Sequence, residues 1–159
     1  MTQYNLKNNQ LKLSVKKSPF IIRYLLFLIA FMTFTLPILG MIGSVVTGNG
    51  FDFGFLIGIG LFSLLAFYLF RIALWNTYGE EIILFSKNEI IYEANYGWFR
   101  DAKKTIENQN INYDFSKVGY EEDNEAVLIL NNGKEAIECA VKMKQVQIEE
   151  LILILSTKN

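Results

Sequence analysis

The feature that most limits what this chain can fold into is an apolar run without charge, Tyr24 to Val46, which is 23 residues long. At about 1.5 Å per residue, a helix of this length covers roughly 34 Å, enough to cross a hydrocarbon core of about 30 Å with some tilt. A signal peptide has a shorter apolar stretch, of about 7–15 residues, before a small-residue cleavage site. Because this run is longer and a second one follows at once, we expect a membrane span.

The second apolar run, Phe53 to Phe70, contains 18 uncharged residues and continues past Arg71 to Trp75. Only a short polar segment, Thr47 to Asp52, separates it from the first run. Two spans joined by so short a loop must be antiparallel neighbours. We therefore predict a transmembrane helical hairpin over residues 24–77.

Basic residues lie on one side of the predicted hairpin. The basic N-terminal segment, residues 1–23, carries five of them, whereas the connecting turn has no basic residue and a single charged one, Asp52. The positive-inside rule then predicts that both termini are cytoplasmic and that the protein is integral to the plasma (inner) membrane. We expect the interface anchors of the two spans to be a group of basic and aromatic residues: Arg23, Arg71, Trp75 and Tyr78.

Three residues of the hairpin are candidates for shaping how its helices pack. Pro37 has Thr33 four residues before it, where a freed carbonyl can be satisfied and the helix can kink, so it is either a tolerated membrane proline or a gating hinge. Gly54 and Gly58 form a GxxxG pattern, which permits close helix approach. We expect these glycines to pack against the first span, with homodimerisation as the alternative. The absence of charge deep in either run argues against an ion or proton pathway.

From Tyr78 onward the pattern changes to that of short strands. Apolar residues and turn signals predict about six antiparallel strands, and Asn132-Gly133 carries the signature of a type I′ hairpin. The expected strands cover residues 80–85, 89–96, 99–106, 111–115, 126–130 and 136–141. A C-terminal amphipathic helix is indicated by apolar residues at helical spacing: Ile148, Leu151, Ile152 and Leu155.

This order of strands followed by a capping helix is what a pleckstrin-homology-like (PH-like) barrel requires, so residues 78–159 are predicted to form a PH-like cytoplasmic domain. Upstream, Gln10 to Lys16 also alternates between apolar and polar residues. This segment fits two structures equally well. It is either an edge strand of the same sheet or a basic amphipathic stub on the membrane surface.

The layout resembles that of small bacterial two-span membrane proteins with a PH-like cytoplasmic domain. The resemblance rests on Ile90 to Gly97, followed by Arg100 and Lys103 and leading to Ile111. A looser similarity in layout, with Leu74-Trp75-Asn76 at the exit of the second span, links it to the two-span assembly factor family of photosystem I. The first resemblance implies a membrane hairpin carrying a PH-like domain; the second gives no reason to infer photosynthesis.

Composition narrows the function classes. There is no histidine, the commonest general base and metal ligand, and a single cysteine, Cys139, is expected to be buried and inert. The formal net charge of −1 provides no basic stripe for nucleic acid. The carboxylate groups Glu80-Glu81 and Glu121–Asp123 lack calcium-loop spacing and are expected to be exposed. We predict no catalytic, cofactor or metal residues and no nucleic-acid partner.

Two groups of residues are candidates for contact with a partner or a membrane. Trp98 and Phe99 follow Gly97 at a strand turn, where core packing and surface contact are both open. Arg100, Lys103 and Lys104 would either meet anionic headgroups or form a solvated strand face.

The expected function is that of a non-enzymatic membrane protein whose PH-like domain docks a protein partner at the cytoplasmic membrane face, for assembly, scaffolding or regulation. Its partners would be the lipid bilayer and a membrane protein. Two alternatives remain from other classes: an immunity protein against a membrane-targeting toxin, and a small channel or transporter subunit.

Overall fold

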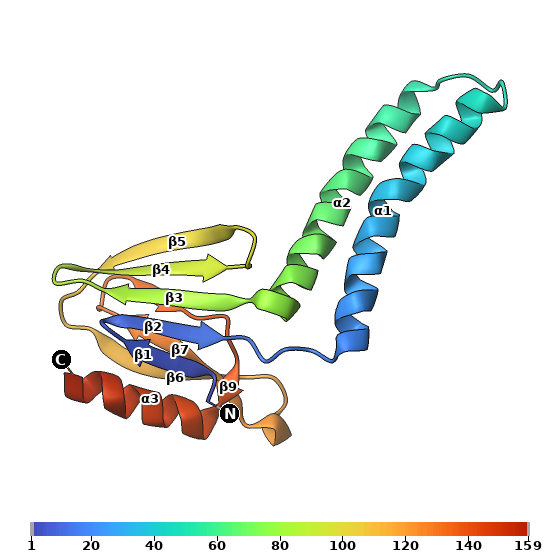
Figure 1. Ribbon diagram of the computed structural model, residues 1–159. Coiled ribbons are helices and arrows are strands. Elements are labelled where there is room, and N and C mark those ends of the chain that lie inside the picture. The colour runs from blue at the N-terminus through green and yellow to red at the C-terminus, as the bar shows by residue number, and fades with distance from the viewer. Residues whose placement is uncertain (1, 159) are drawn as a thin grey trace. The chain divides into compact units, whose positions relative to one another are not determined.

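The computed structural model describes residues 2–158, which divide into two compact units (Figure 1). The helical unit is Lys17–Thr77. The β unit combines the described residues up to Lys16 with those from Tyr78 onward. Sequence reasoning placed the corresponding boundaries at residues 23/24 and 77/78. The structure assigns the N-terminal segment up to Lys16 to the same unit as the C-terminal half.

The helical unit contains α1 (Phe20–Val46) and α2 (Phe53–Tyr78), of 27 and 26 residues. Both are long and apolar enough to cross a membrane, and few of their side chains are buried within the protein. A helix of this length covers about 40 Å, so each exceeds the thickness of a hydrocarbon core. The two apolar helices of the predicted hairpin are therefore confirmed, and α1 continues through Pro37 as a single helix.

The contacts between α1 and α2 are made by aromatic and small residues. Phe27 and Phe70 meet edge to face, with ring centroids 5.8 Å apart. Ala30 and Ala66 are the most buried residues in the middle of their helices. Near the chain ends of this unit, the hydroxyl of Ser18 donates a hydrogen bond to the amide oxygen of Asn76 at 2.9 Å.

The expected close packing at Gly54 and Gly58 is not present within the chain. A Cβ placed on Gly58 would meet nothing within 4 Å, and one on Gly54 would meet only the side chain of Asp52. The first span therefore does not approach these glycines. The prediction was wrong because small residues permit close approach but do not enforce it, and here the bulkier contact is made elsewhere along the helices.

The first sheet of the β unit is an antiparallel meander of five strands in the order β1-β2-β3-β4-β5 (Figure 1). Its strands are β1 (Tyr4–Lys7), β2 (Gln10–Ser14), β3 (Glu80–Phe85), β4 (Glu89–Asn95) and β5 (Arg100–Glu107). β2 pairs with β3, with Ser14 opposite Glu80 and Gln10 opposite Leu84. Of the two structures open to the upstream segment, the strand is the one observed. Leu11 and Leu13 are fully buried in it.

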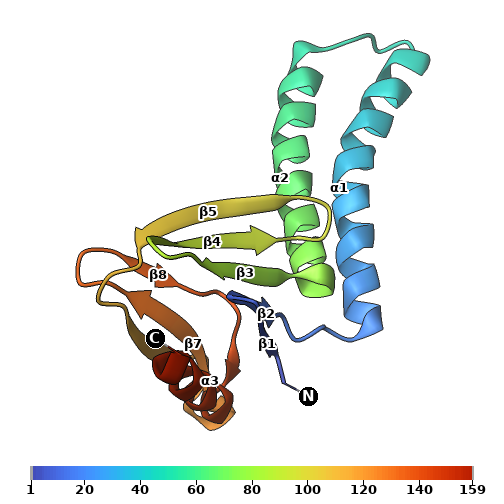
Figure 2. The same cartoon turned by 60° about the vertical axis from the view of Figure 1, so that its left-hand side comes forward.

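The second sheet comprises β6 (Asn112–Val118), β7 (Glu125–Asn131), β8 (Ala136–Glu138) and β9 (Met143–Lys144), with β6, β8 and β9 all paired to β7. A 3₁₀ turn, η1 (Glu121–Asp123), precedes β7. The chain ends in α3 (Gln145–Lys158), which contacts β6 and β7 and lies beside β7 in Figure 2. Its stripe of Ile148, Leu151 and Leu155 is buried, as the helical spacing predicts.

The antiparallel strands and the C-terminal helix are confirmed, with two local corrections. The stretch 136–141 is not one strand, because β8 ends at Glu138 and the chain re-enters the sheet only at β9. The turn before β8 is not a two-residue type I′ turn. Four residues lie between the paired residues Asn131 and Ala136, and within them the N–H of Asn132 donates to the carbonyl of Glu135. A type I′ turn needs positive φ at both central residues, but only Gly133 of the Asn-Gly pair has it.

Candidate functional site

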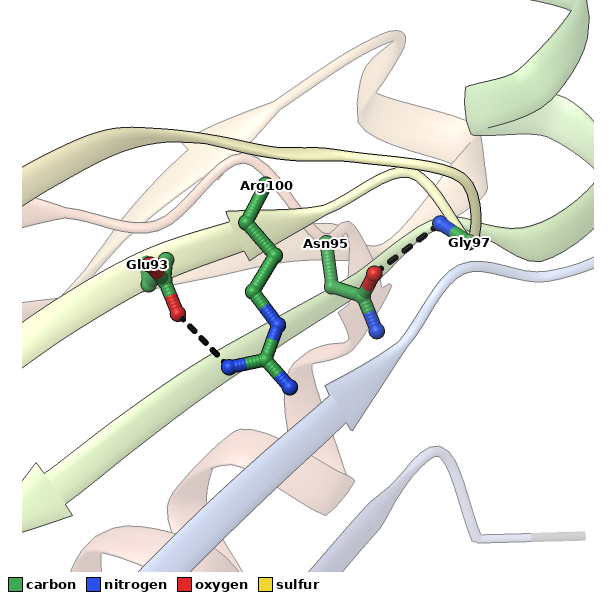
Figure 3. Close-up of polar contacts among 4 residues, drawn as sticks. All are labelled: Glu93, Asn95, Gly97 and Arg100. Atoms are coloured by element: carbon green, nitrogen blue, oxygen red, sulfur yellow. Dashed lines mark hydrogen bonds and ion pairs between the residues drawn. The ribbon is translucent and has the colours of Figure 1, made fainter.

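The connection between β4 and β5 is a tight turn held by hydrogen bonds. The N–H of Tyr96 donates to the carbonyl of Phe99 at 2.9 Å. Figure 3 shows the second bond, in which the N–H of Gly97 donates to the side-chain oxygen of Asn95 at 2.9 Å. Gly97 has a φ of +87°, a conformation that favours glycine. We call the four residues Tyr96–Phe99 the aromatic turn.

The aromatic turn exposes one of its three rings. Tyr96 is buried, and the ring of Phe99 stacks on it with centroids 4.8 Å apart and planes at 12°. Trp98, by contrast, is 74% exposed. The two predicted aromatic contact residues therefore have different positions. Phe99 stabilises the turn from within, and Trp98 is presented on the surface by a rigid support.

The backbone of the aromatic turn packs directly on Tyr78. A Cβ placed on Gly97 would lie 2.7 Å from the Cβ of Tyr78, closer than real carbon atoms approach. A side chain at position 97 would therefore prevent this contact. Because Tyr78 is the last residue of α2, the turn lies against the point where the second apolar helix passes into the sheet.

Strand register places four residues in one row across the first sheet. Ser14 lies opposite Glu80, Glu80 opposite Asn95, and Asn95 opposite Arg100. We call this row the connected end of the sheet, because the chain leaves it after Ser14 toward α1 and re-enters it at Glu80 from α2. With strands about 4.8 Å apart, the row spans roughly 14 Å. The aromatic turn extends beyond the same row.

The basic candidates lie on β5, the edge strand next to the aromatic turn. Arg100 makes an ion pair with Glu93 at 3.1 Å (Figure 3), and Lys103 and Lys104 are exposed. Ala102, which lies between Arg100 and Lys103, has a φ of +57°, and the pairing of β4 with β5 shifts register there. A bulge and lysines are common on edge strands, where they discourage pairing with another chain. This arrangement favours the solvated strand face over a headgroup site.

Glu81 is the main correction to the sequence analysis, which expected both acidic pairs to be exposed. Its side chain is fully buried. The carboxylate accepts hydrogen bonds from the O–H of Tyr92 at 2.5 Å and from the N–H groups of Ala140 and Val141 at 2.6 and 3.0 Å. Glu81 therefore joins the first sheet to the segment that follows β8. In the second acidic group, Glu122 and Asp123 are exposed, as expected, and the side chain of Glu121 lies outside the described residues.

The missed burial of Glu81 had a signal in the sequence. Successive strand residues point to opposite faces, so one of the adjacent residues Glu80 and Glu81 had to share the face of Ile83. Ile83 is fully buried in the core, and Glu81 lies two residues before it. What the sequence could not supply was the set of donors, since Ala140 and Val141 are distant in the chain.

Burial also changes the acid–base properties of this cluster. It raises the pKa of Glu81 above its ordinary value, with the hydrogen bonds from Ala140, Tyr92 and Val141 partly offsetting it. The pKa values of Tyr92 and Cys139 are raised for the same main reason, with the charge of Glu81 adding to the effect. The thiol of Cys139 is buried, as predicted, and a raised pKa makes it a poor nucleophile.

The predicted interface anchors lie at the ends of the two helices. Arg23 is in the first turns of α1, with its guanidinium 6.0 Å from the ring centroid of Phe20. Arg71 and Trp75 are half-buried near the end of α2, and Tyr78 is half-exposed. These positions are compatible with basic and aromatic residues at a membrane–water interface.

The described residues line hollows in both units. In the helical unit, a groove of about 600 Å³ between α1 and α2 is lined mainly by phenylalanines: Phe27, Phe31, Phe34, Phe67 and Phe70. In the β unit, a pocket of about 290 Å³ with mixed lining includes Asn9, Phe85, Lys87 and Leu155. The latter lies at the end of the sheet opposite the connected end, since it is formed by the β1–β2 and β3–β4 turns.

Comparison of the chain with protein-family models, with curated proteins and with solved structures gives no match. Among residues 2–158, no group of three or more histidine, cysteine, aspartate or glutamate side chains gathers in a way that would hold a metal ion. The site that can be built from the described residues is therefore a surface. It consists of the exposed indole of Trp98 on a hydrogen-bonded turn of the β unit, next to Tyr78.

Proposed function

We propose that this chain is an integral membrane protein without catalytic activity, whose β unit is a docking module for a membrane protein partner at the cytoplasmic face. The observation that carries the proposal is the pairing of β2 with β3. One sheet is assembled from strands before and after two apolar helices. The β unit is consequently tied to the hairpin through two adjacent strands.

This pairing supports an even number of membrane crossings. β2 ends at Ser14 and β3 begins at Glu80, and these residues are direct partners. Strands that are partners are about 4.8 Å apart, so both ends of the hairpin must emerge on the same side of the bilayer. Two crossings satisfy this condition, and one crossing does not. The hairpin predicted from apolar run lengths and the sheet register agree on this point.

Charge distribution supports a cytoplasmic position for the β unit. The N-terminal segment contributes Lys7, Lys12, Lys16, Lys17 and Arg23, whereas the turn between α1 and α2 contains Asp52 and no basic residue. Short loops rich in lysine and arginine remain in the cytoplasm. In a bacterial cell, this orientation corresponds to the inner membrane with both termini inside.

The strand order supports a PH-like assignment. Counted from β2, the β unit has four consecutive strands in one sheet, then β6 to β9 in the second, and then a helix. β8 and the two-residue β9 both pair with β7, so we count them as two pieces of one interrupted strand. Seven antiparallel strands closed by a C-terminal helix are the pattern expected of a PH-like barrel. In this interpretation the hairpin is inserted between the first and second strands of the barrel, and β1 is an addition at its edge.

The surface that we assign to protein docking is on α3. Val146 and Leu153 are seven residues apart, so they share one face of the helix, and they are 74% and 67% exposed. Exposed apolar side chains on one helix face are a common recognition mode for a groove on a partner. This face is separate from the buried stripe of Ile148, Leu151 and Leu155 that holds α3 on the second sheet.

Affinity purification of the full-length chain from native membranes in mild detergent tests the proposal. We expect one membrane protein to be recovered in stoichiometric amount, and its recovery to be lost in the double variant Val146→Ser, Leu153→Ser. Leu84→Thr, which changes an exposed apolar residue of β3, serves as the matched control and should retain the partner. Recovery of the chain alone, or only with further copies of itself, would contradict the docking proposal.

Truncation is a poor test for this protein. Removing residues 80–159 would also remove the partner strand of β2, because β2 and β3 belong to one sheet. The deletion would expose the hydrogen-bonding edge of β2 and the side chains of Leu11 and Leu13, which are buried in the full chain. Their exposure would produce effects unrelated to docking. Point variants of exposed residues avoid this problem.

A further inference from the structure

The connected end of the first sheet has a defined place along the chain relative to the apolar helices. Glu80 is two residues after Tyr78, the end of α2, which is at most about 7 Å of extended chain. On the other side, five residues, Val15 to Pro19, separate β2 from α1, and they include Lys16 and Lys17. If α1 and α2 cross a bilayer, these short connections keep Ser14 and Glu80, two of the four residues of the connected end, close to its surface.

The aromatic turn lies between β4 and β5 just beyond this row. It is also in direct contact with Tyr78, since the Gly97 backbone leaves no room for a Cβ there. Both observations follow from strand register and local contact within the β unit. They place the aromatic turn beside Tyr78, the residue at which α2 ends.

The chemistry of the turn fits that level of a membrane. Tryptophan has an amphipathic ring that concentrates at the headgroup region of bilayers. Trp98 is 74% exposed on a turn fixed by two hydrogen bonds and by the stack of Phe99 on Tyr96. A rigid support reduces the conformational entropy lost on insertion. The connection between β2 and α1 contains Lys16 and Lys17, and basic residues close to a membrane surface are attracted to anionic lipid.

We propose that Trp98 is a lipid anchor that inserts its indole into the headgroup region of the same bilayer that α1 and α2 cross. The β unit would then be held to the membrane at three places: the start of α1, the end of α2 and the aromatic turn. This inference rests on the membrane-spanning part of the proposed function and is independent of the docking part.

Tryptophan fluorescence in lipid vesicles tests the anchor, because the chain contains two tryptophans, Trp75 and Trp98. In Trp75→Phe, Trp98 is the only emitter; in Trp98→Phe, Trp75 is. Each full-length variant is reconstituted into vesicles of phosphatidylethanolamine and phosphatidylglycerol. Bromine atoms are placed either near the headgroup end of the acyl chains or near their methyl ends, and acrylamide serves as the aqueous quencher.

For Trp98 we expect blue-shifted emission, loss of most intensity with bromine near the headgroups, and weaker quenching with bromine near the methyl ends. Emission typical of water, with strong acrylamide quenching and no effect of brominated lipid, would overturn the anchor. Protection from both quenchers would also overturn it, because a protein surface would then cover Trp98.

The Trp98→Phe variant, in which Trp75 is the only emitter, separates this inference from the proposed function. Trp75 lies within α2, so brominated lipid should quench it whenever the hairpin is inserted. Quenching of Trp75 without quenching of Trp98 would reject the anchor and leave the membrane hairpin intact. Absence of quenching for both residues would reject the membrane hairpin itself, and the anchor with it.

Discussion

The phenolic O–H of Tyr92 donates a hydrogen bond to the carboxylate of Glu81 across 2.5 Å, and both residues are buried. The same carboxylate accepts two backbone N–H groups, from Ala140 and Val141. A buried carboxylate with three donors ties β3 and β4 to the segment between β8 and β9. This relationship sits three residues after the end of α2, so it fixes the part of the β unit that the hairpin enters.

Glu81→Gln should destabilise the β unit by about 1–3 kcal/mol, because the amide nitrogen must face one of the donors that now meet the carboxylate. Thermal unfolding of the full-length protein in detergent, followed by circular dichroism in the strand region, measures the change. Glu80→Gln is the matched control, since Glu80 is only half-buried, and its effect should stay within about 0.5 kcal/mol. Equal effects of the two variants would contradict the role assigned to Glu81.

Stability should fall as the pH rises through the folded-state pKa of Glu81. Burial raises this pKa above the ordinary value of 4.5, so between the two values the folded state binds more protons than the unfolded state. The stabilising contribution of protonated Glu81 to the folded state is therefore fully present below about pH 4.5 and is lost as the pH rises through the folded-state pKa. Unfolding curves recorded from about pH 4 upward should show a fall in unfolding free energy with pH for the unmodified protein and a flatter profile for Glu81→Gln. Parallel profiles would mean that another group causes the dependence.

Gly97→Ala should destabilise the protein more than Gly133→Ala. Both glycines have positive φ, +87° and +85°, so both variants carry a backbone penalty of about 1–2 kcal/mol. Only at Gly97 does the new Cβ also meet Tyr78, which adds an overpacking penalty of about 1–3 kcal/mol. The difference in unfolding free energy between the two variants measures the contact of the aromatic turn with Tyr78. A difference near zero would show that this contact is absent in solution.

Gly58→Leu should be tolerated in the hairpin, whereas Ala66→Leu should not. Open space surrounds Gly58, while Ala66 is 6% exposed beside the first helix. Overpacking at Ala66 should cost about 1–3 kcal/mol and lower the thermal stability of the protein in vesicles. The oligomeric state is measured in parallel by cross-linking in the membrane. Loss of a dimer in Gly58→Leu would instead assign the GxxxG pattern to an interface between two copies of the chain.

Cys139 should react with a maleimide only when the β unit opens. Its side chain is 2% exposed and burial raises the pKa of the thiol, so both access and thiolate fraction are low. We expect negligible labelling of the folded protein and rapid labelling in denaturant. Glu81→Gln should increase the labelling rate, because Ala140 and Val141, which follow Cys139 directly, lose their acceptor. Rapid labelling of the natural folded protein would contradict the burial of this segment.

The helices and most strands could be predicted because their signals are local. A run of 23 uncharged residues limits the possibilities by length, and the alternation around Ile111, Tyr113 and Phe115 places one face of β6 toward the interior. The aromatic turn was also visible as Gly97 between two strands. Whether Trp98 or Phe99 would be exposed was open, because both rings suit either position.

The sequence by itself determined that two apolar helices form a hairpin and that strands followed by a helix come after it, since chain length, hydrophobic period and turn residues act over short distances. Only the tertiary structure decided that β2 joins β3, that Glu81 is buried under the donors of Ala140 and Val141, and that Gly97 lies on Tyr78. These relationships depend on backbone groups and strand partners far apart in the chain. Strand alternation near Ile83 gives a local signal for the burial of Glu81, but its donors and the other pairings are properties of how the elements assemble.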